Sequence, residues 1–145
     1  MADEDRVDRT ESERLVFGEG TILIKTSSEE TGGAFAVFEE VPPLLDTPLH
    51  VHHNEDELYY SLEGEHVFQR AEEEVRIAPG EVVFLPRGVP HAHRRAVPGH
   101  GRLLGVVSPG GFEGFFRSLA EAARKGSLNA EAYTEASERY GITWL

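Results

Sequence analysis

Residues 49–64 read LHVHHNEDELYYSLEG and carry the strongest structural signal in the sequence. His50 and His52 are two residues apart on an expected strand, so their side chains point to the same face. Glu57 follows on the next expected strand. The spacing predicts that two imidazoles and one carboxylate converge within a β structure.

A second stretch, residues 80–91, reads GEVVFLPRGVPH. Gly80-Glu81 and Arg87-Gly88 have the composition of turns and bracket a short strand. His91 then opens the strand that follows. This strand is expected to bring a third imidazole to the first two.

The sequence around these stretches is a series of short runs rich in Val, Ile, Phe and Tyr, separated by Gly, Pro and Asn. Strands are expected at 21–26, 34–41, 49–53, 57–62, 65–70, 74–77, 82–85, 91–95 and 102–108. Many short strands at close spacing predict an all-β sandwich or barrel.

The hydrophobic period changes after Gly111, where apolar residues recur at intervals of three and four up to Gly126. This pattern predicts an amphipathic helix. A second helix is expected from Asn129, a good N-cap, to Gly141. Both helices need a partner surface for their apolar stripes, so we expect them to pack on the outside of the barrel or to seal one end of it.

With 145 residues the chain has the size of one domain. Residues 1–13 are highly charged and are expected to form a flexible acidic arm. Residues 14–110 are expected to form the barrel, and residues 111–145 a helical segment packed on it. No internal repeat is visible, and each site motif occurs once.

Acidic residues outnumber basic ones 26 to 14, which gives a net charge of −12. This charge repels phosphate backbones and anionic membranes, so no nucleic-acid or membrane partner is expected. The chain has no cysteine, so any metal ligands must be His, Asp or Glu. The N-terminal residues lack the apolar core of a signal peptide, and a cytoplasmic location is expected.

The two motifs, H-x-H-x4-E-x6-G and G-x5-P-x-G-x2-H, resemble the paired signature of the cupin superfamily. The matching residues are His50, His52, Glu57 and Gly64 in the first motif and Gly80, Pro86, Gly88 and His91 in the second. Two positions depart from the pattern: Leu44 stands where a glycine is expected, and Arg95 where an asparagine is often found. The resemblance implies a single cupin β-barrel, a jelly-roll sandwich, whose two C-terminal helices resemble those of quercetin-dioxygenase-like small cupins.

The resemblance further implies one divalent metal ion per chain, held by His50, His52 and His91 with Glu57 as the usual fourth ligand. This set of donors accepts zinc, iron, nickel, manganese and copper, and we favour zinc. His93 shares the parity of His91 and should face the same interior, as a fourth imidazole ligand, a proton shuttle or a wall residue. Wall or shuttle is favoured, because residues two apart on a strand lie roughly 6 to 7 Å apart.

Arg70 is a candidate partner of Glu57. If Glu63 and Gly64 form a two-residue hairpin turn, the register sets Arg70 opposite Glu57, where a bidentate pair could draw the carboxylate off the metal. Tyr59 is expected on the same face as Glu57. The interior is then expected to be mostly apolar and aromatic with a few polar side chains, which suits a flat, oxygenated aromatic ligand.

Two reactions fit these expectations. The preferred one resembles the cupin-type aromatic polyketide cyclases of actinomycete pathways, enzymes of antibiotic biosynthesis that promote redox-neutral aldol closure of an aromatic ring. Glu57 or His93 would be the base, and Tyr59 or Arg70 would donate hydrogen bonds. The alternative is a flavonol (quercetin) dioxygenase. A third reading is a small-molecule-binding cupin without catalysis. Barrels with exposed edge strands often pair, so a homodimer is expected.

Overall fold

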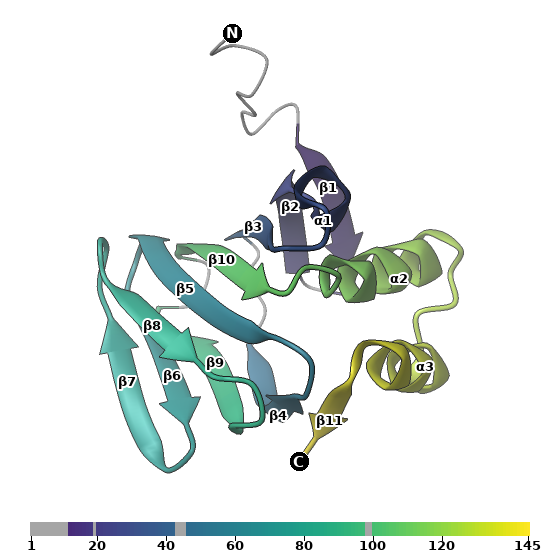
Figure 1. Ribbon diagram of the computed structural model, residues 1–145. Helices are drawn as coiled ribbons and strands as arrows, with labels where there is room; N and C mark the ends of the chain where they lie inside the picture. Colours follow the sequence, from purple (N-terminus) through teal and green to yellow (C-terminus); the bar gives the residue numbers. More distant parts are fainter. Residues whose placement is uncertain (1–11, 19, 43–45, 98–99) are drawn as a thin grey trace, which may run out of the picture.

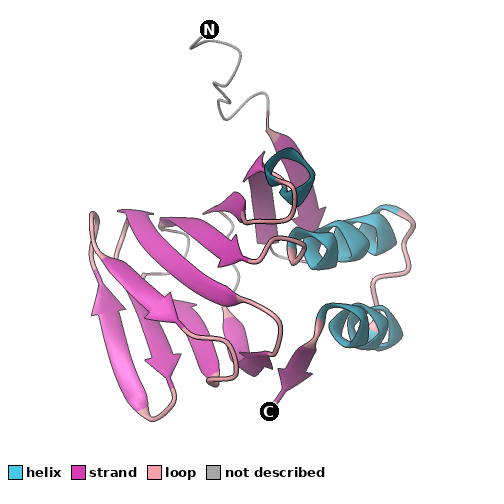
Figure 2. Cartoon of the chain, viewed as in Figure 1, coloured by secondary structure: helices cyan, strands magenta, loops and turns pink. Residues whose placement is uncertain are grey.

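The computed structural model describes residues 12–18, 20–42, 46–97 and 100–145, so Leu44 and most of the expected N-terminal arm lie outside the described residues. The described strands form two sheets, and two helices near the C-terminus lie together at one end of the molecule (Figures 1 and 2). The prediction of an all-β jelly-roll sandwich with two C-terminal helices is confirmed.

The first sheet has the strand order β1-β2-β3-β10-β5-β8. Its strands are β1 (Glu13–Phe17), β2 (Gly20–Thr26), β3 (Ala36–Val41), β10 (Arg102–Ser108), β5 (Asp56–Glu63) and β8 (Val82–Leu85). The sequence did not predict β1, which starts at the last residue of the expected arm. Its two buried apolar residues, Leu15 and Phe17, alternate with exposed ones, as in a half-buried strand.

The second sheet has the strand order β11-β4-β9-β6-β7. Its strands are β11 (Ile142–Trp144), β4 (Thr47–His52), β9 (His91–Arg95), β6 (His66–Arg70) and β7 (Glu73–Ile77). The sequence did not predict β11, a short strand that adds to the edge of β4 and sets Trp144 opposite His50. Its three residues carry too little pattern to be recognised before the partner strand is known.

The expected hairpin between β5 and β6 is wrong. Both edges of β5 are already taken by β10 and β8, while β6 lies in the other sheet between β9 and β7. Gly64, with a φ of 78°, carries the chain from one sheet to the other. A Cβ atom there would stand 3.0 Å from the Cα of Gly101, so only glycine fits this crossing comfortably.

The described helices are α1 (Ser28–Thr31), α2 (Glu113–Arg124) and α3 (Ala130–Tyr140). Asn129 caps α3 by accepting a hydrogen bond from the backbone N–H of Ala132 at 2.9 Å, and Gly141 follows the helix in the left-handed conformation, both as expected. No helix of the described part of the chain is long and apolar enough to cross a membrane.

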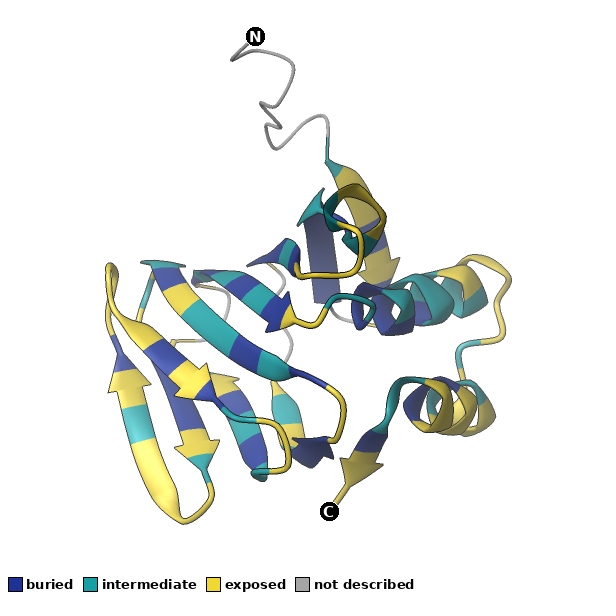
Figure 3. Cartoon of the chain, in the orientation of Figure 1, coloured by how far each residue is buried: buried dark blue, intermediate teal, exposed yellow. Residues whose placement is uncertain are grey.

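The core lies between the sheets and under α2 (Figure 3). The ring of Phe116, from α2, lies 5.0 Å from that of Phe38 and 5.9 Å from that of Phe17. Gly105 on β10 makes room for this packing, because a Cβ atom there would approach the ring of Phe38 to 2.5 Å. The helix therefore seals one end of the sandwich with aromatic side chains.

Candidate metal centre

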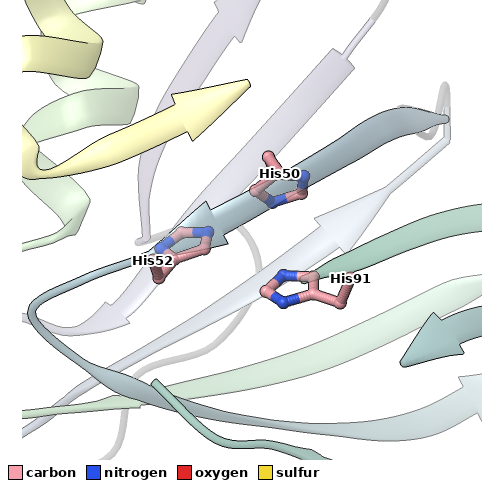
Figure 4. Close-up of side chains that lie close together, drawn as sticks. All are labelled: His50, His52 and His91. Atoms are coloured by element: carbon pink, nitrogen blue, oxygen red, sulfur yellow. The ribbon is translucent and has the colours of Figure 1, made fainter. Parts of the chain in front are cut away.

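Three buried histidines converge from two neighbouring strands of the second sheet. His50 and His52 come from β4 and His91 from β9, and one potential ligand atom of each lies within 4.8 Å of the others. Figure 4 shows the three rings close together. The β4–β9 ladder contains an irregularity between Thr47 and His50, yet both β4 histidines keep their side chains buried at the same site.

Two of the rings have a fixed orientation. The Nδ1 atom of His50 lies 2.7 Å from the carbonyl oxygen of Pro48, and the Nδ1 atom of His52 lies 2.7 Å from the Oε1 atom of Glu55. Each Nδ1 therefore carries the proton and donates it, which leaves the Nε2 lone pair of both rings for a metal. Metal-binding histidines are typically held in this way by a carbonyl or a carboxylate.

Glu57 extends toward the same site from the opposite sheet. Its Oε2 atom lies 3.0 Å from the Nε2 atom of His91 and 3.5 Å from that of His52. Among the described residues, this buried oxygen has no hydrogen bond of good geometry. A buried carboxylate oxygen next to imidazole nitrogens fits a divalent cation, so the donor set present here is chemically suited to hold one.

The electrostatics of the site favour the deprotonated forms of His50 and Glu57 but not that of His52. Burial and the nearby His91 lower the pKa of His50 to about 4, so this ring is neutral at physiological pH. Burial alone would raise the pKa of Glu57, but the adjacent His52 and the contact with His91 outweigh it, and its pKa lies below the usual value. Burial opposes the charged form of His52, but Glu57 and Glu55 raise its pKa.

A cavity of about 370 Å³ adjoins the histidines. Its walls come from both sheets, including the edge strand β11, and from the helices, and they are mostly apolar and aromatic. The lining residues are Phe17, Glu40, Asp46, Thr47, Pro48, His50, His52, Glu57, Tyr59, Phe68, His91, His93, Phe112, Phe115, Phe116, Leu119, Tyr133, Ile142 and Trp144. The volume is in the range of pockets that hold small organic molecules.

His93 faces the cavity but is turned away from the three-histidine cluster. The Nε2 atom of His66 lies 3.0 Å from the carbonyl oxygen of Glu63 and donates to it, so the Nδ1 atom of His66 accepts from the Nε2 atom of His93 at 3.1 Å. The ring of His93 also lies 4.8 Å from that of Phe68. This arrangement holds His93 in the cavity wall.

Arg70 does not meet Glu57, contrary to the expectation. It lies at the end of β6, opposite His91 and Glu73, and its guanidinium group donates to the carbonyl oxygen of Phe84 and pairs with Glu73. The cause is the sheet crossing described above, which invalidates the hairpin register. Tyr59 does line the cavity, and burial and nearby acidic groups raise its pKa well above 10.0, so its hydroxyl stays a hydrogen-bond donor.

The sequence did not point to three residues of the site. Glu55 lies within the first motif, in the loop between β4 and β5, and only its distance to His52 reveals it. Glu40 lines the cavity from β3. A charged residue at an inward position of an otherwise apolar strand is the sequence feature that could have indicated it. Trp144 stacks near His50, with the ring centres 4.9 Å apart, because β11 pairs with β4.

Comparisons with known proteins agree with the two-sheet fold. The family model described as Cupin domain matches residues 37–107. A quercetin 2,3-dioxygenase of Bacillus subtilis is 31% identical over 113 residues, or 77% of this chain. The present chain spans only about a third (33%) of the length of that relative.

Two solved structures are similar as well. The polyketide cyclase RemF of Streptomyces resistomycificus has a TM-score of 0.59 and 25% identity, over 71% of this chain and 78% of that one. A predicted oxalate decarboxylase from Thermotoga maritima has a TM-score of 0.60 and 28% identity, over 72% of this chain and 98% of that one. The chain thus contains a cupin domain, as the two sequence motifs, the two-sheet sandwich and the family match over residues 37–107 together show.

Proposed function

We propose that this protein is a metal-dependent polyketide cyclase that closes an aromatic ring by a redox-neutral aldol reaction. The observation that carries the proposal is the three-histidine cluster at the wall of a largely aromatic cavity of about 370 Å³. A cavity of this size and character suits a folded poly-keto chain. Similarity to the cyclase RemF supports the same reading.

In this mechanism His50, His52 and His91 would hold a divalent metal, with zinc favoured and Glu57 as a further ligand. A divalent metal supplies a Lewis acid that polarises a carbonyl group. Glu57, ionised because its pKa is lowered, is placed to accept the acidic C–H proton next to that carbonyl. The hydroxyl of Tyr59 donates a hydrogen bond to oxygen on which negative charge develops.

The aromatic walls set which ring forms. Phe112 lies against His52, with ring centres 4.6 Å apart, and Trp144 lies against His50. These rings limit the conformations of a bound chain and exclude water from the reacting carbons. Arg70 contacts Phe84 and Glu73 rather than Glu57, so the expected pairing of Arg70 with Glu57, one of the grounds for preferring the cyclase, no longer supports it.

A flavonol dioxygenase is the second candidate, and the sequence comparison favours it specifically. The quercetin dioxygenase of Bacillus subtilis is 31% identical over the matched region. Glu57, 3.0 Å from His91, would serve in that reaction too as ligand and as base. An oxalate decarboxylase fits less well, because oxalate is small and doubly charged while this cavity is mostly apolar.

The test combines metal analysis with product analysis. First, the purified protein is analysed for transition metals. In a separate experiment, the protein is co-expressed with a polyketide synthase that releases an uncyclised chain, and the products of the cells are identified by mass spectrometry. We expect about one zinc ion per chain and a shift toward one cyclised product. His50→Ala should abolish both, whereas His53→Ala, a change at an exposed neighbour bonded to Thr143, should preserve both. Oxygen uptake with quercetin and a redox-active metal would instead establish the dioxygenase.

A further inference from the structure

A carboxyl group outside the metal centre lies buried in the wall of the cavity. Glu40, on β3, is only 6% exposed and lines the cavity. Within the described ranges of the chain, no hydrogen bond or ion pair reaches its carboxyl group. Glu39, which points to the other face of the same strand, pairs with Arg102 and Lys25. The inward carboxyl group is thus the exception on this strand.

The neighbouring strands offer the carboxyl group of Glu40 no polar partner, and the group faces the cavity. Its partners in the adjacent strands are Ile22 on β2 and Leu103 on β10, both apolar and buried. Burial, with a smaller contribution from the charge of Glu57, raises the pKa of Glu40 to about 8. Its carboxyl group is therefore neutral at physiological pH and carries a proton that it can donate.

A buried polar group without a partner costs stability, usually about 1 to 3 kcal/mol. Nothing in the packing of β3 requires a carboxyl group at this position, since an apolar residue would match Ile22 and Leu103 better. Groups of this kind are kept where they act on something that enters the site. The cavity is what Glu40 faces, so a ligand is the partner to consider.

Glu40 and the metal centre occupy different parts of the cavity wall. Glu40 lies opposite Leu103, which lies opposite Ser61, and Glu57 is four residues further along β5. Both glutamates line the same cavity, and the charge of Glu57 still acts on Glu40. The three histidines belong to the other sheet. A ligand that contacts both Glu40 and the histidines must therefore reach across the cavity from one sheet to the other.

We propose that Glu40 is a second recognition point of the cavity, where its carboxyl group donates a hydrogen bond to a carbonyl or phenolic oxygen at the end of the ligand remote from the histidines. The inference deepens the proposed function, on which it rests for the class of ligand. A polycyclic hydroxylated ketone or a folded poly-keto chain carries oxygens at both ends and can therefore contact the histidines and Glu40 together.

Binding of a probe tests this directly. Emodin, a three-ring hydroxylated ketone, is titrated into the metal-loaded protein, and Trp144, the single tryptophan of the chain and a cavity residue, reports binding by fluorescence quenching. Glu40→Leu should weaken emodin binding by on the order of tenfold, the loss expected for one buried hydrogen bond. Glu40→Gln should bind within about threefold of wild type, because an amide also donates.

Two further readouts separate recognition from a structural role. Metal content should be the same in both variants, and Glu40→Leu should unfold at the same or a higher temperature than wild type, because an unsatisfied polar group has been removed. Infrared spectroscopy should show a protonated carboxyl band that is missing in Glu40→Gln and shifts when emodin binds to the wild type. This measurement needs only the conservative variant.

Three results would overturn the inference: no emodin binding to wild type, unchanged emodin affinity in Glu40→Leu, or a large loss of stability in both variants. Failure of the proposed function is distinguishable. If no cyclised product forms in the co-expression assay but emodin binding still depends on Glu40, the recognition point stands and only the reaction is wrong.

Discussion

The hydrogen bond between His52 and Glu55 offers the sharpest test of the metal centre. Both side chains are buried, and the Nδ1 to Oε1 distance is 2.7 Å. Glu55→Gln keeps the shape of the side chain but replaces the charged acceptor with a neutral amide. The imidazole is then a poorer electron donor and is less firmly oriented, because a charge-assisted hydrogen bond is roughly twice as strong as a neutral one.

The expected loss is about 10- to 100-fold in metal affinity, the usual effect of removing such a partner. That corresponds to about 1.4 to 2.7 kcal/mol of binding free energy. The assay is competition for zinc with a chromogenic chelator, and the unfolding midpoint of the metal-free protein is measured alongside it. His53→Ala, next in sequence but exposed, is the matched control and should bind zinc like wild type.

Unchanged zinc affinity in Glu55→Gln, with the protein folded, would refute this reasoning. It would mean that the carboxylate neither orients His52 nor adjusts its basicity. Equal losses in Glu55→Gln and in His53→Ala would refute it as well, because they would indicate a general disturbance of the turn.

Three other predictions follow from the geometry. Arg70→Ala should leave zinc affinity and zinc content unchanged, since Arg70 contacts Phe84 and Glu73 rather than Glu57. A clear change in a zinc titration would indicate that Arg70 acts on Glu57 after all. Gly105→Ala should destabilise the fold by about 1 to 3 kcal/mol in urea unfolding, because the new methyl group collides with the Phe38 ring. Glu40 keeps its proton in the folded state up to a pH of about 8 but loses it near 4.5 when unfolded, so its contribution to stability declines as pH rises across that window. The stability of Glu40→Gln relative to wild type should therefore increase with pH in the same window, and a constant difference would contradict the raised pKa.

The architecture and the three histidines of the candidate metal centre could be predicted from the sequence. Alternation and turn residues located nearly all the described strands of the sandwich, and β8, β9 and β10 have the predicted bounds. The H-x-H spacing placed His50 and His52 on one face, because the side-chain period of a strand is two residues. These features depend on local geometry, which the sequence expresses directly.

The pairing of the strands and the surroundings of the histidines became known only from the three-dimensional structure. Local pattern cannot tell a hairpin from a crossing between sheets, so Arg70 was placed beside Glu57 although β6 belongs to the other sheet. The same holds for Trp144, which reaches His50 through the pairing of β11 with β4, and for Glu40, whose partnerless position appears only when Ile22 and Leu103 flank it. Contacts between residues distant in the chain arise from packing of whole elements, and no periodicity within one element records them.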